Sequence, residues 1–82
     1  MTFDIIVNVA LKDAILDPAG QSTAKVLRNM GYPVQDVRIG KQIKLQVTAE
    51  SLNDAKEKAR QMAEKLLANP VMETYDIVVR ES

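Results

Sequence analysis

The first stretch of the chain, residues 2–12, alternates between hydrophobic and polar positions. The hydrophobic positions that share one face of an extended backbone are Phe3, Ile5, Val7, Val9 and Leu11. This period of two, with its β-branched side chains, predicts a strand with one buried face. On the opposite face Ile6 stands between the polar residues Asp4 and Asn8.

Asp17 and Pro18 mark the expected start of a helix, with Asp17 as the N-cap and Pro18 at the first helical position. Hydrophobic residues then recur at three-residue spacing, at Ala24, Leu27 and Met30. Gly31 is expected to end this helix because glycine readily takes the left-handed conformation at a helix C-terminus.

Residues 34–49 contain two alternating hydrophobic runs separated by Gly40 and Lys41. The hydrophobic positions are Val37 and Ile39 before the break and Ile43, Leu45, Val47 and Ala49 after it. This pattern predicts a β-hairpin with its turn at Gly40 and Lys41.

A second helix is expected from Ser51 to about Ala68. Ser51 is its N-cap, and Asp54 stands three residues later, in a position like that of a capping box. The hydrophobic stripe at spacings of three and four consists of Leu52, Ala55, Ala59, Met62 and Leu66. Asn69 and Pro70 end the helix.

The last stretch alternates again and predicts a final strand, with Tyr75, Ile77 and Val79 facing inward and Val78 as a hydrophobic exception facing outward. The element order is strand, helix, strand, strand, helix, strand. Right-handed crossovers then predict an α+β fold in two layers, a ferredoxin-like βαββαβ domain over residues 1–82. We expect one antiparallel sheet with both helices on one face.

The charge balance and the composition argue against several classes of protein. The chain has 11 Lys and Arg against 11 Asp and Glu, so it lacks the basic excess of a general nucleic-acid binder or a polybasic membrane segment. No hydrophobic run approaches the length of about 20 residues that a transmembrane helix needs. Asp4 and Asn8 interrupt the N-terminal hydrophobic stretch, which does not fit a signal peptide. We therefore expect a cytoplasmic protein.

The chain has neither cysteine nor histidine. Disulfides and thiolate metal sites are therefore excluded, and the commonest general base in enzymes is missing. A chain of 82 residues buries only about 60–65% of the surface that its unfolded form exposes, which leaves a thin core. Association with another subunit is the remaining way to stabilise such a domain, and we expect a homo-oligomer, either a dimer or a tetramer.

Few residues suggest chemistry of their own. Asp13 and Asp17 flank the loop before the first helix, but Asp17 is better explained as the helix cap than as half of a catalytic pair. A basic group at Arg38, Lys41 and Lys44 could contact a phosphate, although lysines at a hairpin also protect a sheet edge from aggregation. No aromatic residue stands on the outer strand positions that RNA-recognition domains use for stacking.

The outer face of the predicted sheet carries a small hydrophobic spot. Ile6 and Val78 belong to the first and last strands, which are neighbours in this fold. A spot of this size is often without consequence. On a thin domain with balanced charge, it can also be part of a contact between subunits.

Three groups of short strings run in order along the chain. They are Leu11-Lys12 with Leu16-Asp17-Pro18-x-Gly20, then Gly31-Tyr32 with Val34-x-Asp36-Val37-Arg38-x-Gly40-Lys41, and Glu64-Lys65-Leu66-Leu67-Ala68-Asn69-Pro70-Val71 with Glu73 and Tyr75. In combination these strings resemble the PurS family, the small subunit of phosphoribosylformylglycinamidine synthase, over nearly the whole chain. Asp13-Ala14 stands where family members often have Pro-Gly.

The resemblance implies a non-catalytic assembly subunit of a ligase complex in purine biosynthesis. In that complex a large synthetase subunit uses ATP and Mg²⁺, a separate glutaminase releases ammonia, and the small subunit bridges the two, so we expect no cofactor, metal or catalytic residue in this chain. The partners expected are the synthetase subunit, the glutaminase subunit and further copies of the chain, with neither nucleic acid nor membrane. Residues expected at partner interfaces are Ile6, Val78, Leu16, Asp17, Pro18, Arg38 and Lys41.

Two other functions remain open from the residues alone. One is a stand-alone regulatory module that senses a small molecule, since such modules share this element order. The other is a small phosphate-transfer enzyme that uses Arg38, which is the more remote of the two.

Overall fold

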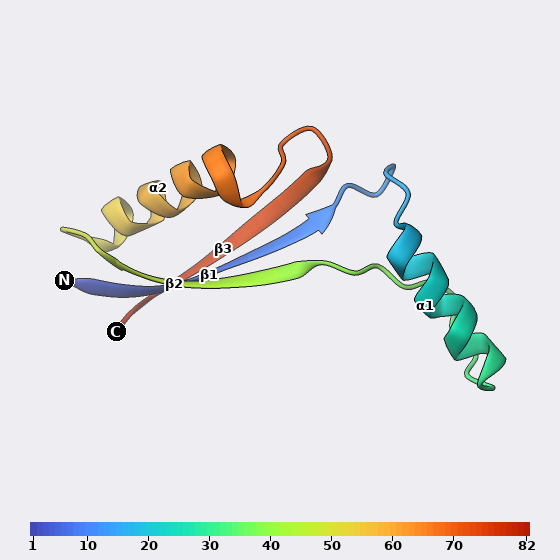
Figure 1. The fold of residues 1–82 in the computed structure, drawn as a ribbon. Coiled ribbons are helices and arrows are strands. Elements are labelled where there is room, and N and C mark those ends of the chain that lie inside the picture. The colour runs from blue at the N-terminus through green and yellow to red at the C-terminus, as the bar shows by residue number, and fades with distance from the viewer.

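The computed structural model describes residues 1–82 as three strands and two helices (Figure 1). The elements in chain order are β1 (Thr2–Leu11), α1 (Pro18–Asn29), β2 (Lys41–Thr48), α2 (Leu52–Met62), the π-helical turn η1 (Ala63–Leu67) and β3 (Glu73–Glu81). The strands form one antiparallel sheet in the order β2-β1-β3. The predicted α+β class and the antiparallel sheet are therefore confirmed.

The core lies between the inner face of the sheet and α2. The alternation in β1 buries its odd-numbered side chains from Phe3 to Val9 almost completely, and the helical side contributes small residues. Because alanine side chains are short, α2 can approach the sheet closely. The most deeply buried residues are Phe3, Ile5, Val7 and Val9 from β1, and Ala55, Ala59 and Ala63 from α2 and η1.

The helix α1 does not cover the sheet. It projects beyond one end of it, whereas α2 lies across one face (Figure 1). The molecule measures 51 × 26 × 14 Å, and its radius of gyration is 16.2 Å, against about 12 Å for a compact domain of this length. This corrects the expectation of two helices on one face. Only Gly20 and Ala24 of α1 are buried, and Val26 of this helix and Met30 at its end remain exposed.

The predicted hairpin at Gly40 and Lys41 is also absent, so the sheet has three strands rather than four. A two-residue turn there would set Ile39 opposite Gln42, and each apolar residue of one strand would then meet a polar residue of the other. Since a one-residue change of register exchanges the two faces of a strand, such pairing is unfavourable. The chain instead passes through residues 34–40 without pairing and enters β2 at Lys41.

Asp17 fixes the path of this segment. Its buried carboxylate accepts the N–H of Gly20 at 2.8 Å, as expected of a helix cap, and also the N–H of Ile39 at 2.7 Å. A side chain at Gly20 would collide with the carbonyl oxygen of Val37, so only glycine permits this close approach. The start of α1 and residues 37–39 are thereby held together.

The second helix begins as predicted and ends differently. The Ser51 hydroxyl accepts the N–H of Asp54 at 3.1 Å. After Met62 the helix widens into η1, in which the N–H of Ala68 donates to the carbonyl of Ala63 at 2.8 Å. This wider turn moves Leu66 out of the apolar stripe in which the sequence placed it, and Leu66 is 83% exposed.

Replacement of the Asp17 carboxylate is expected to destabilise the fold. Asp17→Asn keeps the size of the side chain but loses one acceptor oxygen and the negative charge, so one of the two backbone N–H groups is left without a partner. We expect the midpoint of thermal unfolding to fall by about 5 °C or more. Asp13→Asn, at an exposed loop position before α1, is the matched control and is expected to change little.

The loss of stability caused by Asp17→Asn should also depend on pH. Hydrogen bonds from the N–H groups of Ile39 and Gly20 hold the pKa of the Asp17 carboxyl below its ordinary value of 3.8. A lowered pKa in the folded state stabilises the protein above the unfolded pKa, and this contribution is lost as the pH falls through the folded pKa. Thermal unfolding measured from pH 7 to pH 2.5 should therefore show the gap between wild type and Asp17→Asn shrinking below about pH 4.

Candidate interaction surface

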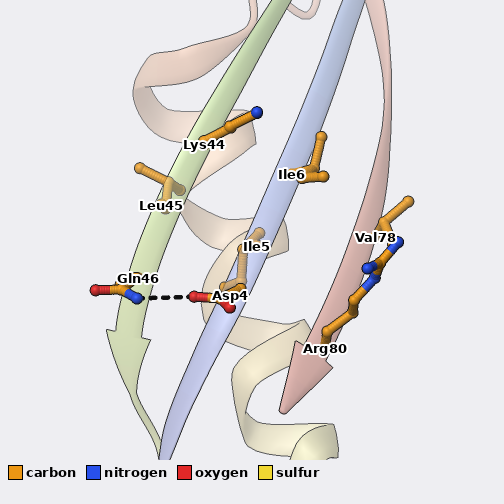
Figure 2. A pocket seen from close by; sticks show the side chains of 8 residues that line it. All are labelled: Asp4, Ile5, Ile6, Lys44, Leu45, Gln46, Val78 and Arg80. Atoms are coloured by element: carbon orange, nitrogen blue, oxygen red, sulfur yellow. Dashed lines mark hydrogen bonds between the residues drawn. The ribbon is translucent and has the colours of Figure 1, made fainter. Parts of the chain in front are cut away.

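The outer face of the sheet, opposite α2, carries the hydrophobic spot predicted from the sequence. Ile6 and Val78 stand directly opposite each other in the β1–β3 ladder, and Val78 is 41% exposed. They border a hollow of about 470 Å³ (Figure 2). The other residues that line it are Asp4, Ile5, Lys44, Leu45, Gln46 and Arg80.

Polar side chains around this spot bind one another across the strands. The Gln46 amide donates to the Asp4 carboxylate at 2.9 Å (Figure 2), and the Gln42 amide donates to the Asn8 side-chain oxygen at 3.1 Å. Lys44 lies directly opposite Ile6 in the β1–β2 ladder and belongs to none of the salt bridges in the chain. The outer face thus presents a small apolar centre with a polar and partly cationic border.

A second group of predicted residues meets at the base of α1. Leu16 is 61% exposed there, and Pro18 is exposed at the first turn of the helix. The Arg38 guanidinium donates to the carbonyl of Lys12 at 2.9 Å, so it joins the run before β2 to the loop after β1. Asp17 is only 4% exposed, and its role is therefore to hold the backbone rather than to contact a partner.

Lys41 is exposed at the first position of β2, opposite Val9 of β1. It lies between the base of α1 and the sheet but does not line the outer hollow. The seven predicted residues therefore form two groups: Ile6 and Val78 on the sheet, and the remainder at the base of α1 and the start of β2.

Several exposed apolar residues were not predicted as contacts. Among them, the sequence pattern had placed Met30 at the end of the first helix and Leu66 of the second helix inward, and the projection of α1 and the π-helical turn bring these two to the surface. The periodicity of the sequence carries no signal for either change. The residues are Val26, Met30, Tyr32, Ile39, Leu66, Val71 and Met72.

The exposed face of α2 carries the expected ion pairs. Arg60 pairs with Glu57 and Glu64, and the ammonium of Lys58 lies 2.7 Å from the Asp54 carboxylate. The Tyr75 hydroxyl on β3 donates to Glu64 at 3.0 Å, and burial together with this carboxylate raises the pKa of Tyr75. Exposed pairs of this kind stabilise a protein little. No group of three or more acidic, histidine or cysteine side chains converges in a way that could hold a metal ion.

No helix combines the length and the apolar character that crossing a bilayer requires.

Comparison with known proteins places this chain among related sequences and structures. The family model described as PurS, phosphoribosylformylglycinamidine (FGAM) synthase, matches residues 4–81. The chain is 42% identical over 80 residues to the phosphoribosylformylglycinamidine synthase subunit PurS of Bacillus subtilis, covering 96% of this chain and 94% of that protein. It is 41% identical over 76 residues to the subunit PurS of Archaeoglobus fulgidus, covering 92% and 95%.

Solved structures agree with the sequence comparison. The fold superposes on a chain of the PurLQS structure from Thermotoga maritima with a TM-score of 0.90 at 36% identity, covering 98% of this chain and 99% of that chain. It also superposes on Bacillus subtilis PurS with a TM-score of 0.85 at 42% identity, covering 96% and 99%. The resemblance drawn from the short strings is thereby confirmed: the chain belongs to the PurS family, whose named members are subunits of phosphoribosylformylglycinamidine synthase.

Proposed function

We propose that this chain is a non-catalytic assembly subunit that bridges the glutaminase and synthetase subunits of phosphoribosylformylglycinamidine synthase. In this complex, formylglycinamide ribonucleotide, glutamine and ATP give formylglycinamidine ribonucleotide, glutamate, ADP and phosphate. The observation that carries the proposal is the match over nearly the whole chain, at a TM-score of 0.90, to a chain of the Thermotoga maritima PurLQS structure. We further propose that the subunit helps to enclose the path of ammonia between the two active sites, in a cytoplasmic complex.

The proposed contribution of this chain is surface rather than a reacting group. The side chains closest to catalytic types already have partners within the fold: Asp17 binds two backbone N–H groups, and Arg38 binds a backbone carbonyl. ATP and Mg²⁺ would be used by the synthetase subunit, with no cofactor held here. This assignment fits a chain whose exposed apolar residues lie on α1, on the outer sheet face and beside η1, where they can be covered by other subunits.

Self-association belongs to the same proposal. Only 12 of the 82 residues are buried, so the core of one copy is small, and the projecting α1 leaves much apolar surface in water. A dimer or a tetramer would bury part of this surface.

Reconstitution tests the assembly function. Purified synthetase and glutaminase subunits of the same source should convert formylglycinamide ribonucleotide with glutamine at least about tenfold faster when this chain is added, because ammonia would then pass between them without loss. Activity with ammonium chloride in place of glutamine, measured in parallel, should change much less. Glutamine-dependent activity that is the same with and without the chain would contradict the proposal.

The outer sheet face can be tested in the same assay. Ile6→Lys places an ammonium at the apolar centre beside Val78, and we expect the concentration of this chain needed for half-maximal activity to rise about tenfold or more. Asn8→Lys adds the same charge two residues away on the same face and is the matched control. If both variants behave as wild type while the chain itself is required, the contact lies elsewhere on the molecule.

A further inference from the structure

Two cations flank the apolar centre of the outer sheet face, and neither has an acidic partner within the chain. Lys44 lies directly opposite Ile6 in the β1–β2 ladder. Arg80 lies two residues beyond Val78 on β3. Both cations are exposed and line the hollow of about 470 Å³ (Figure 2), and neither takes part in any salt bridge of the chain. The apolar centre is thus bordered by a free positive charge on each side.

The acidic residue that lines this hollow is turned away from Arg80. Asp4 and Arg80 stand directly opposite each other in the β1–β3 ladder, a position in which opposite charges stabilise a sheet. The Asp4 carboxylate instead accepts the Gln46 amide of β2 at 2.9 Å, on the other side of β1 (Figure 2). Arg80 therefore keeps its charge available for a group outside the chain.

The charges of this face favour an acidic protein partner over the other classes of partner that cations attract. Nucleic acids and anionic membranes are bound through many clustered cations, whereas the hollow has two, in a chain with no net charge. A second copy of the chain would bring the same two cations, so this face does not complement itself. A protein segment with an apolar side chain between two carboxylates would fill the centre and neutralise both cations.

We propose that the outer sheet face docks an acidic segment of the synthetase–glutaminase pair. An apolar side chain of this segment fills the centre of the hollow, and its carboxylates pair with Lys44 and Arg80. The inference rests on the proposed assembly function and names the chemistry of the partner at one of its surfaces. Charges at the border of an interface act mainly on the rate of association, because they steer the encounter between the two proteins.

Charge changes of opposite sign on this one face test the proposal. Lys44→Gln removes a cation and should slow association with the synthetase–glutaminase pair about threefold, and Lys44→Glu should slow it about tenfold. Asp4→Asn removes the carboxylate but keeps an oxygen that accepts the Gln46 amide, so it should speed association about two- to threefold. Biolayer interferometry with this chain immobilised measures the rate constants. Slowing by all three variants would indicate general damage to the face and would overturn the proposal.

Lys56→Glu is the matched control. Lys56 is an exposed lysine of α2, on the other side of the sheet, and takes part in no salt bridge. This variant changes the net charge by the same amount as Lys44→Glu, and its association rate should stay close to that of wild type. Equal slowing by the two variants would assign the effect to the charge of the whole molecule and overturn the docking site. Circular dichroism checks that each variant folds.

The salt dependence of association gives a second measurement. Raising the NaCl concentration from about 50 mM to about 300 mM screens the border charges, so the wild type should associate several-fold more slowly. The double variant Lys44→Gln/Arg80→Gln should lose most of this dependence, because both cations are gone. A double variant that keeps the salt dependence of wild type would overturn the proposal.

The outcomes separate this inference from the proposed function. Suppose that glutamine-dependent activity requires the chain but that Lys44→Glu/Arg80→Glu associates as fast as wild type. The assembly function would then stand, and the acidic docking site would be overturned. A synthetase–glutaminase pair that never binds the chain would overturn both.

Self-association on this face is a separate outcome. Sedimentation equilibrium of the isolated chain should give the same mass for Lys44→Glu/Arg80→Glu as for wild type. A changed mass would show that a second copy covers the outer sheet face, which would overturn the acidic docking site.

Discussion

Much of this molecule depends on a single carboxylate that serves two backbone groups. Asp17 caps α1 and at the same moment holds Ile39, a residue 22 positions later in the chain. Because a buried carboxylate is stable only when it is well hydrogen-bonded, both contacts must be kept together. The direction in which α1 leaves the sheet, and the unpaired course of the chain before β2, both follow from this arrangement.

The sheet and its core could be predicted from the sequence because they obey local periodicity. The period of two in β1 placed Phe3 and Val7 on the buried face, and both are buried. The helix caps Asp17 and Ser51 could also be predicted, because each side chain accepts a backbone N–H only three residues later in the chain. Ile6 and Val78 were correctly expected to be neighbours on the outer face.

The parts that could not be predicted depend on contacts between distant segments. The run from Val37 to Ile39 has the composition of a strand, but its faces are out of phase with β2 across a two-residue turn, and the bond from Ile39 to Asp17 decides its position. In the same way the apolar spacing of α1 suits a helix packed on a sheet, although α1 lies beyond the sheet. Which surfaces a subunit uses is a property of its partners as well, and the periodicity of one chain carries little information about it.

The π-helical turn at the end of α2 has a consequence for how this family can change. Such a turn contains one residue more than an α-helical segment spanning the same ends. Loss of one residue between Ala63 and Leu66 would therefore restore regular helical winding and leave Leu67 packed against the core. Such a deletion would reshape the exposed end of the helix and leave the packing against the sheet unchanged, so this position can gain or lose a residue without disturbing the core.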